Sequence, residues 1–106
     1  MRELWVVDSS PLIALGRIGR LDLFSSLASD VVVPKAVAVE LRRAEDEASL
    51  ALSASWIRIE RTEIHHLVAA WGLGAGETAV LSFAKLNEGY VAVVGERWCA
   101  ARLNTG

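Results

Sequence analysis

The segment LWVVDSSP, residues 4–11, joins an apolar run to a helix start through one acidic residue. Four apolar residues without polar alternation predict a strand that is buried on both faces, as in a parallel sheet. Ser10 and Pro11 predict the start of a helix, because a hydroxyl caps the first turn and proline fits its first position. Asp8 therefore lies at the carboxyl end of the predicted strand, either as a further helix cap or as a functional acid.

The rest of the chain alternates predicted strands with predicted helices. Further strands are predicted at residues 31–33, 56–60 and 90–94. Helices are predicted at residues 11–18, 21–27, 35–53, 62–71, 77–86 and 96–103. This alternation favours a three-layer α/β fold, in which helices cover both faces of a parallel sheet. Ligands of such sheets bind beyond the carboxyl ends of the strands, which is where Asp8 lies.

Length and composition predict one folded domain over residues 1–106, because 53% of the residues are apolar. No apolar run approaches the ~20 residues that cross a membrane. Asp8 also interrupts what would be the apolar part of a signal peptide, so we expect a cytoplasmic protein without a membrane partner. Cys99 is the only cysteine, which excludes an internal disulfide and a zinc site of several thiolates. The net charge of −2 gives no overall attraction for nucleic acid.

Two further acids stand where an apolar run gives way to a helix. Glu40 lies one turn into the segment that follows residues 31–33, and Glu77 follows the GAG segment at 74–76. Each acid has an ordinary alternative, as a helix cap, a helix-surface residue or a first-turn partner of the helix dipole. Three carboxylates at one sheet edge would repel one another unless a cation neutralised them. A divalent metal site that hydrolyses phosphodiesters is therefore the specific hypothesis.

Two other motifs do not support a site. Residues 74–79 match the G-x-G-x-x-G/A dinucleotide fingerprint, but that fingerprint must follow a strand and here follows a predicted helix. His65 and His66 are adjacent, and neighbouring residues of a helix point about 100° apart, so the two are not expected to share a metal ion. Solvent or a local hydrogen bond is the expected environment of both.

Three segments together resemble PIN-domain proteins, in the branch near the VapC-type toxins of toxin–antitoxin pairs. These segments are VVDSSPLIAL at residues 6–15, VVVPKAVAVEL at 31–41 and LGAGETAV at 73–80. They follow one another in the family's order and, with the last predicted strand, cover nearly the whole chain. The resemblance implies a PIN-like fold with acids at the carboxyl edge of its sheet. It also implies a metal-dependent endoribonuclease, the toxin of a toxin–antitoxin pair.

The resemblance also assigns roles to individual residues. It implies that Mg²⁺ or Mn²⁺ is held, directly or through water, by Asp8, Glu40, Glu77 and Glu96. The ion would activate a water molecule for attack on an RNA phosphodiester and stabilise charge on the phosphate oxygens. Substrate contacts would come from Ser9, Ser10 and Arg97. The implied partners are an RNA substrate and a cognate antitoxin that masks the site.

The chain departs from the family in two places. Members of this branch carry an acidic pair after the last of these strands, whereas Gly95 precedes Glu96 here. The family continues into a further strand and helix, which this chain is expected to lack. The strand at 90–94 would then have a bare edge that favours pairing with a second copy in a homodimer. The alternatives are a catalytically inactive PIN-like interaction module and an α/β domain that binds a small molecule.

Overall fold

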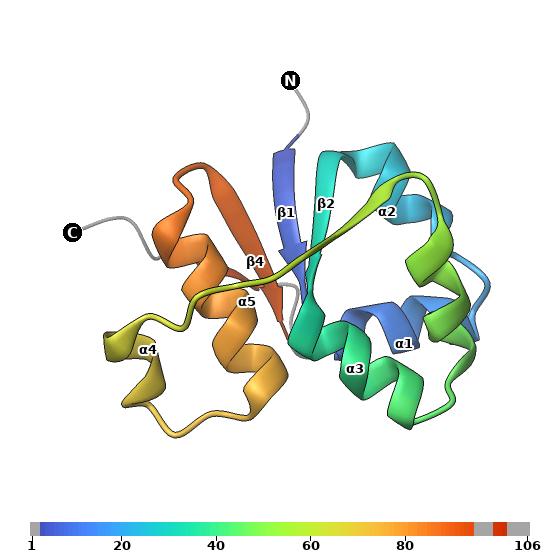
Figure 1. Cartoon of the computed structure of the whole chain (residues 1–106). Coiled ribbons are helices and arrows are strands. Elements are labelled where there is room, and N and C mark those ends of the chain that lie inside the picture. The colour runs from blue at the N-terminus through green and yellow to red at the C-terminus, as the bar shows by residue number, and fades with distance from the viewer. Residues whose placement is uncertain (1–2, 95–98, 102–106) are drawn as a thin grey trace.

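The structure is a computed structural model that describes residues 3–94 and 99–101. The described part of the chain forms a five-stranded sheet in the order β3-β2-β1-β4-β5 (Figure 1). Four strands run parallel to one another: β1 (Glu3–Val7), β2 (Ala28–Pro34), β3 (Ile57–Glu60) and β4 (Tyr90–Val94). The fifth, β5 (Cys99–Ala101), runs antiparallel to β4. The predicted α/β fold with a parallel sheet is confirmed.

Helices lie on both faces of this sheet. The α-helices are α1 (Ser9–Arg17), α2 (Asp22–Leu27), α3 (Lys35–Arg43), α4 (His66–Ala69) and α5 (Ala75–Leu86), and η1 (Glu47–Ser53) is a 3₁₀ helix. Phe24 of α2 packs against Trp5, whereas Phe83 of α5 packs against Tyr90. Trp5 is level with Val91, the neighbour of Tyr90, and adjacent residues of a strand point to opposite faces. Within the described residues, no helix is both long and apolar enough for a membrane crossing.

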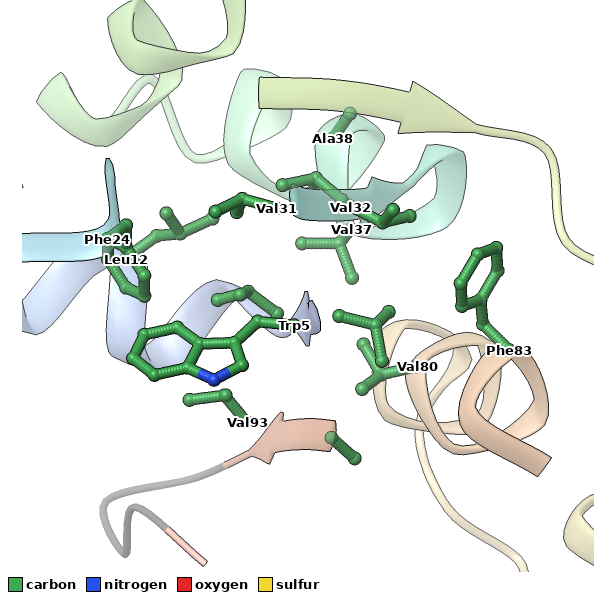
Figure 2. Close-up of a cluster of buried hydrophobic side chains, with 14 of the residues drawn as sticks. Trp5, Leu12, Phe24, Val31, Val32, Val37, Ala38, Val80, Phe83 and Val93 are labelled. Atoms are coloured by element: carbon green, nitrogen blue, oxygen red, sulfur yellow. The ribbon is translucent and has the colours of Figure 1, made fainter. Parts of the chain in front are cut away.

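Branched apolar side chains of the central strands fill the core (Figure 2). Val6, Val7 and the run 31–33 are at most 1% exposed, as expected for strands covered on both faces. On one side, Phe24 lies between two tryptophans: its ring meets Trp5 edge-on at 6.0 Å and stacks with Trp56 at 6.2 Å. This aromatic cluster attaches α2 to the sheet.

The carboxyl ends of β1 and β2 meet at one edge, and this positions the candidate site. Val6 is level with Val32 of β2 and Ala92 of β4. The Asp8 amide donates to the Val93 carbonyl at 3.0 Å, so the strand ladder continues as far as Asp8. The helix α3 starts directly after β2. The segments that carry Asp8 and Glu40 therefore leave the sheet at the same edge.

The single helix predicted over 35–53 is wrong, because a turn divides it. The helix α3 ends at Arg43, and Glu45 adopts a left-handed conformation with φ of 52°. Asp46 then caps η1, as its carboxylate accepts a hydrogen bond from the Ala48 amide at 2.9 Å. Apolar spacing runs through both helices, whereas this local cap decides where the first ends.

The helix predicted over 62–71 is also largely wrong, since only α4 is helical. The His65 amide donates to the Ser82 hydroxyl of α5 at 3.0 Å. His65 Nδ1 accepts from the Leu67 amide at 3.1 Å, which makes His65 the cap of α4. The local hydrogen bond expected for these histidines is thus present at His65. The preceding segment lies across α5 without forming a helix of its own (Figure 1).

The helix predicted over 96–103 is wrong in its described part, because Cys99–Ala101 forms β5. Val93 is level with Ala100, so β5 takes up backbone groups of β4 that would otherwise lack partners. The bare edge expected at 90–94 is therefore covered. Glu96 and Arg97 lie outside the described residues.

Truncation of Phe24 to alanine should lower the free energy of unfolding by about 3–5 kcal/mol, because a fully buried ring is lost from between two tryptophans. Leu27 lies on the same helix but is 52% exposed. Leu27→Ala is the matched control and should cost less than about 1 kcal/mol. Urea unfolding followed by tryptophan fluorescence measures both. Equal losses would show that α2 is not held through Phe24.

Candidate functional site

Ser9 links two of the three predicted acids. Its amide donates to Asp8 Oδ1 at 2.8 Å, and its hydroxyl donates to Glu40 Oε2 at 3.3 Å. Asp8 is only 8% exposed, whereas Glu40 is exposed on α3. The structure thus brings these two acids together at the carboxyl edge of the sheet, although they are 32 residues apart in sequence.

Gly76 holds the second oxygen of Glu40. The Gly76 amide, in the first turn of α5, donates to Glu40 Oε1 at 2.8 Å. A Cβ atom at Gly76 would lie 2.5 Å from that oxygen and 2.9 Å from Cδ, so a side chain here would displace the carboxylate. A helix N-terminus also favours a negative charge. Sequence reasoning missed this role, since it considered the GAG segment as a dinucleotide fingerprint and as part of the third family segment, without a contact for Gly76. The signal was a glycine inside the first turn of a helix.

The electrostatics of Asp8 show that Glu40 and Glu77 both lie close enough to act on it. The pKa of Asp8 is raised, first because burial disfavours its charged form. The hydrogen bond from the Ser9 amide opposes this rise, while the nearby charges of Glu40 and Glu77 add to it. Glu77 lies in the first turn of α5 and is half-buried. All three predicted acids are therefore within electrostatic reach at one edge.

The carboxylates nevertheless do not form a closed metal cage. Within residues 3–94 and 99–101, no three His, Cys, Asp or Glu side chains are grouped closely enough to hold an ion. Glu40 is instead held by Ser9 and Gly76. In charge and donor type the acids fit a divalent cation, because a buried carboxylate repelled by two others gains from a positive charge. These carboxylates would hold such a cation in an open site, some of them through a water molecule.

The remaining predicted site residues have mixed positions. Ser9 contacts both acids, and Ser10 is exposed in the first turn of α1 beside it. Glu96 and Arg97, the predicted fourth ligand and substrate contact, lie outside the described residues. The side chains of His65 and His66 stack on each other with ring centroids 4.7 Å apart.

Comparison with known proteins identifies the family. A family model described as a PIN domain matches residues 4–104, which is nearly the whole chain. No curated protein and no solved structure matched the sequence. The match specifies the family and no branch within it.

Asp8→Asn should stabilise the metal-free protein at neutral pH by several degrees in Tm. The raised pKa means that folded Asp8 binds its proton more tightly than unfolded Asp8 does. Its contribution to stability is therefore greatest below its ordinary pKa of 3.8 and is lost as pH rises through the higher native value. Asparagine keeps an acceptor for the Ser9 amide and has no charge to bury.

Thermal unfolding in EDTA at a series of pH values tests this expectation. The advantage of Asp8→Asn should be largest near neutral pH and disappear at acid pH, where Asp8 itself is protonated. A difference in Tm that does not change with pH would contradict the raised pKa.

Gly76→Ala should displace the Glu40 carboxylate and cost less than about 1 kcal/mol of stability, because that carboxylate is the end of a flexible, exposed side chain. It should also change Mn²⁺ affinity, since Glu40 must move. Gly74 belongs to the same GAG segment, and a Cβ there meets nothing within 4 Å. Gly74→Ala is the control and should cost less than about 1 kcal/mol as a cap change. Equal effects of the two variants on Mn²⁺ affinity would exclude the Gly76–Glu40 contact as a feature of the site.

Proposed function

The chain belongs to the PIN-domain family, which indicates a nuclease-like function, and from this premise we propose that it is a Mg²⁺- or Mn²⁺-dependent endoribonuclease. We further propose that it is the toxin of a toxin–antitoxin pair, in the VapC-like branch. The observation that supports the activity is that Asp8 lies within electrostatic reach of Glu40 and Glu77 at the carboxyl edge of the sheet. A bound cation would offset the repulsion between these carboxylates.

In this proposal Asp8 and Glu40 hold the ion, Glu77 acts directly or through water, and Glu96 is the fourth ligand. A bound Mg²⁺ or Mn²⁺ supplies charge stabilisation at phosphate oxygens and lowers the pKa of bound water. Ser9 keeps Asp8 and Glu40 oriented through its amide and hydroxyl. Burial of Asp8 strengthens its attraction for a cation, because few water molecules screen it.

Substrate contacts and partners complete the proposal. Ser9, Ser10 and Arg97 would contact RNA phosphate groups, and a cognate antitoxin would cover the same edge until it is degraded. A homodimer also belongs to the proposal, but β5 occupies the outer edge of β4, so a second copy would use another surface. The proposed location is the cytoplasm, and residues 1–106 are proposed to form a single PIN-like domain.

A specific observation favours one alternative, a catalytically inactive PIN-like interaction module. Glu40 already has partners for both oxygens, from Gly76 and Ser9, and can serve as a structural link between α3 and α5. Gly95 also stands where the VapC-like branch has an acid. In this alternative the carboxyl edge of the sheet keeps its structure but no longer binds a metal ion.

Glu77→Gln should reduce RNA cleavage at least tenfold and leave the fold intact, because the charge is removed while the shape of the side chain is kept. Cleavage of a single-stranded RNA in Mn²⁺ measures the rate, and circular dichroism checks the fold. Glu47→Gln is the matched control, as Glu47 is also a first-turn glutamate, of η1. Unchanged cleavage in Glu77→Gln would remove Glu77 from the site.

Calorimetric titration of Mn²⁺ separates the proposal from the inactive module. Saturable binding to the wild type that Asp8→Asn abolishes would support the metal site. Absence of binding to folded wild-type protein would favour the interaction module.

A further inference from the structure

A pocket lies at the carboxyl end of α5, away from the acids at the amino end of that helix. It is a cavity of about 500 Å³ lined by residues of β3, the loop after it, α5 and the start of β4: Arg58, Glu60, Arg61, Thr62, Glu63, Phe83, Leu86, Asn87 and Tyr90. Glu77 stands in the first turn of α5 and Leu86 ends the helix. At 1.5 Å per residue these positions are ~14 Å apart along the axis, so the cavity is separate from the acidic edge.

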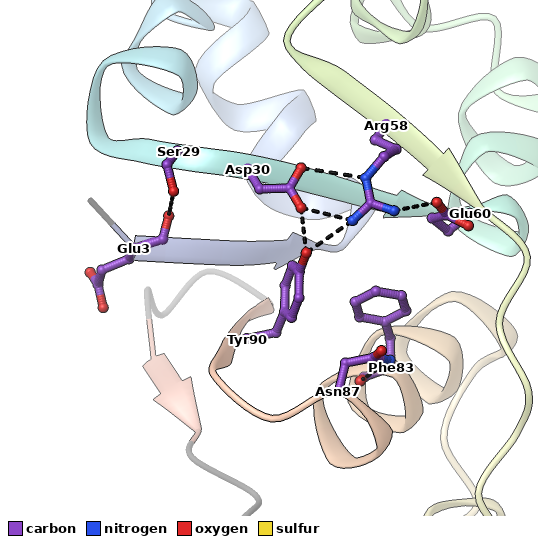
Figure 3. Close-up of polar contacts among 8 residues, drawn as sticks. All are labelled: Glu3, Ser29, Asp30, Arg58, Glu60, Phe83, Asn87 and Tyr90. Carbon is purple, nitrogen blue, oxygen red and sulfur yellow. Dashed lines mark hydrogen bonds and ion pairs between the residues drawn. The ribbon is translucent and has the colours of Figure 1, made fainter. Parts of the chain in front are cut away.

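Arg58 lines this cavity, and polar contacts hold its planar guanidinium group in place (Figure 3). Its Nη2 donates to Asp30 Oδ2 at 2.7 Å and to the Tyr90 hydroxyl at 2.9 Å, and its Nη1 pairs with Glu60. The hydrogen bond from Arg58 also lowers the pKa of Asp30, so the pair stays ionised at neutral pH. Donors along the guanidinium edge are thus in use, while 47% of the Arg58 side chain stays exposed, which leaves surface of the planar group for a ligand.

The other walls suit a planar ligand with polar edges. Tyr90 is half-buried, and its ring meets the buried ring of Phe83 at 5.0 Å and 88°, a contact that holds the Tyr90 ring in place. Asn87 uses its amide nitrogen on the Phe83 carbonyl at 3.0 Å, a bond that leaves its amide oxygen as an acceptor.

The charges around the cavity disfavour a phosphate group inside it. Two arginines, Arg58 and Arg61, face three carboxylates, of Asp30, Glu60 and Glu63, so the local net charge is −1. Arg58 is neutralised by its carboxylate partners. Arg61 is exposed, and no ion pair joins it to another described residue. Among the described residues that line the cavity, Arg61 is therefore a positive charge without an ion-pair partner, beside the ion-paired Arg58.

We propose that this cavity is a nucleobase subsite for single-stranded RNA. The base stacks on the Arg58 plane and the Tyr90 ring, and Asn87 bonds its edge. Arg61 contacts the adjoining phosphate. This inference rests on the proposed ribonuclease function, for which it names a second contact on the same RNA, ~14 Å from the acidic edge. Such a contact fixes the strand and favours one base there.

Arg58→Lys tests the subsite, since lysine keeps the charge and lacks the plane. The probe is a short single-stranded RNA that carries 2-aminopurine, a fluorescent base whose emission falls on stacking, and EDTA prevents cleavage. Wild-type protein should quench the probe, and Arg58→Lys should bind it about tenfold more weakly with the quenching lost. Arg20→Lys is the matched control, because Arg20 is also an exposed, ion-paired arginine, 3.3 Å from Asp22, and should bind as the wild type does.

Arg61→Gln keeps the test valid if Arg58→Lys disturbs the fold. Arg61 is an exposed loop residue, and its loss should reduce the slope of log affinity against log salt by ~0.7. Unchanged affinity, quenching and salt slope in the variants that remain folded would overturn the subsite. Absence of quenching by the wild-type protein would also overturn the subsite. The same result is expected if the cavity binds a peptide and not a base.

The subsite and the proposed function fail in distinguishable ways. RNA that is bound with quenching that depends on Arg58, yet is never cleaved in Mn²⁺, supports the subsite and removes the nuclease activity. Cleavage that depends on Glu77 while binding is indifferent to Arg58 supports the nuclease and overturns the subsite.

Discussion

The hydrogen bond from the Gly76 amide to the Glu40 carboxylate joins the two helices that carry the second and third acids. It forms only because residue 76 has no side chain, and any Cβ would occupy the space of the carboxylate. In this contact the Glu40 carboxylate of α3 lies at the amino end of α5, which carries a partial positive charge. Both helices thus reach the edge of the sheet at which Asp8 follows β1. Core packing of α5 through Val80 and Ala84 fixes the helix on the sheet, and this contact adds a polar link to α3 at its first turn.

The acidic edge costs stability that the rest of the domain must offset. Asp8 is buried, and the charges of Glu40 and Glu77 further disfavour its ionisation. The supporting free energy comes from the opposite kind of residue, the fully buried valines of β1 and β2 directly beneath the site. Conflict between local charge and global stability is typical of positions kept for binding, and a cation relieves it.

Much of the fold was predictable because β1, β2 and β4 contain continuous apolar runs and because Ala79, Val80, Phe83 and Leu86 recur at helical spacing in the segment that forms α5. The helix predicted at 77–86 matches α5 except for its first two residues. The errors arise where one polar contact overrides periodicity: Asp46 divides the segment 35–53, and His65 confines α4 to a single turn. Asp8, Glu40 and Glu77 were predictable as a group from their places after apolar runs. The Gly76 contact was not, because it depends on the distance between two helices.

The long-range polar contacts explain why the cavity at the other end of α5 left no trace in the sequence. Arg58 reaches Asp30 of β2 and Tyr90 of β4, residues 28 and 32 positions away, so no local pattern signals the cluster. Parallel strands make it possible, since they place Asp30 and Tyr90 level with Leu4 on either side of β1. The helix α5 then connects two chemically different regions, acids at its start and a stacking surface at its end.

A net charge of −2 gives no overall attraction for RNA, so affinity would have to come from stacking and single arginine contacts. Stacking varies little with salt, whereas phosphate contacts weaken as salt rises, and a chain of this composition is expected to depend mainly on the first.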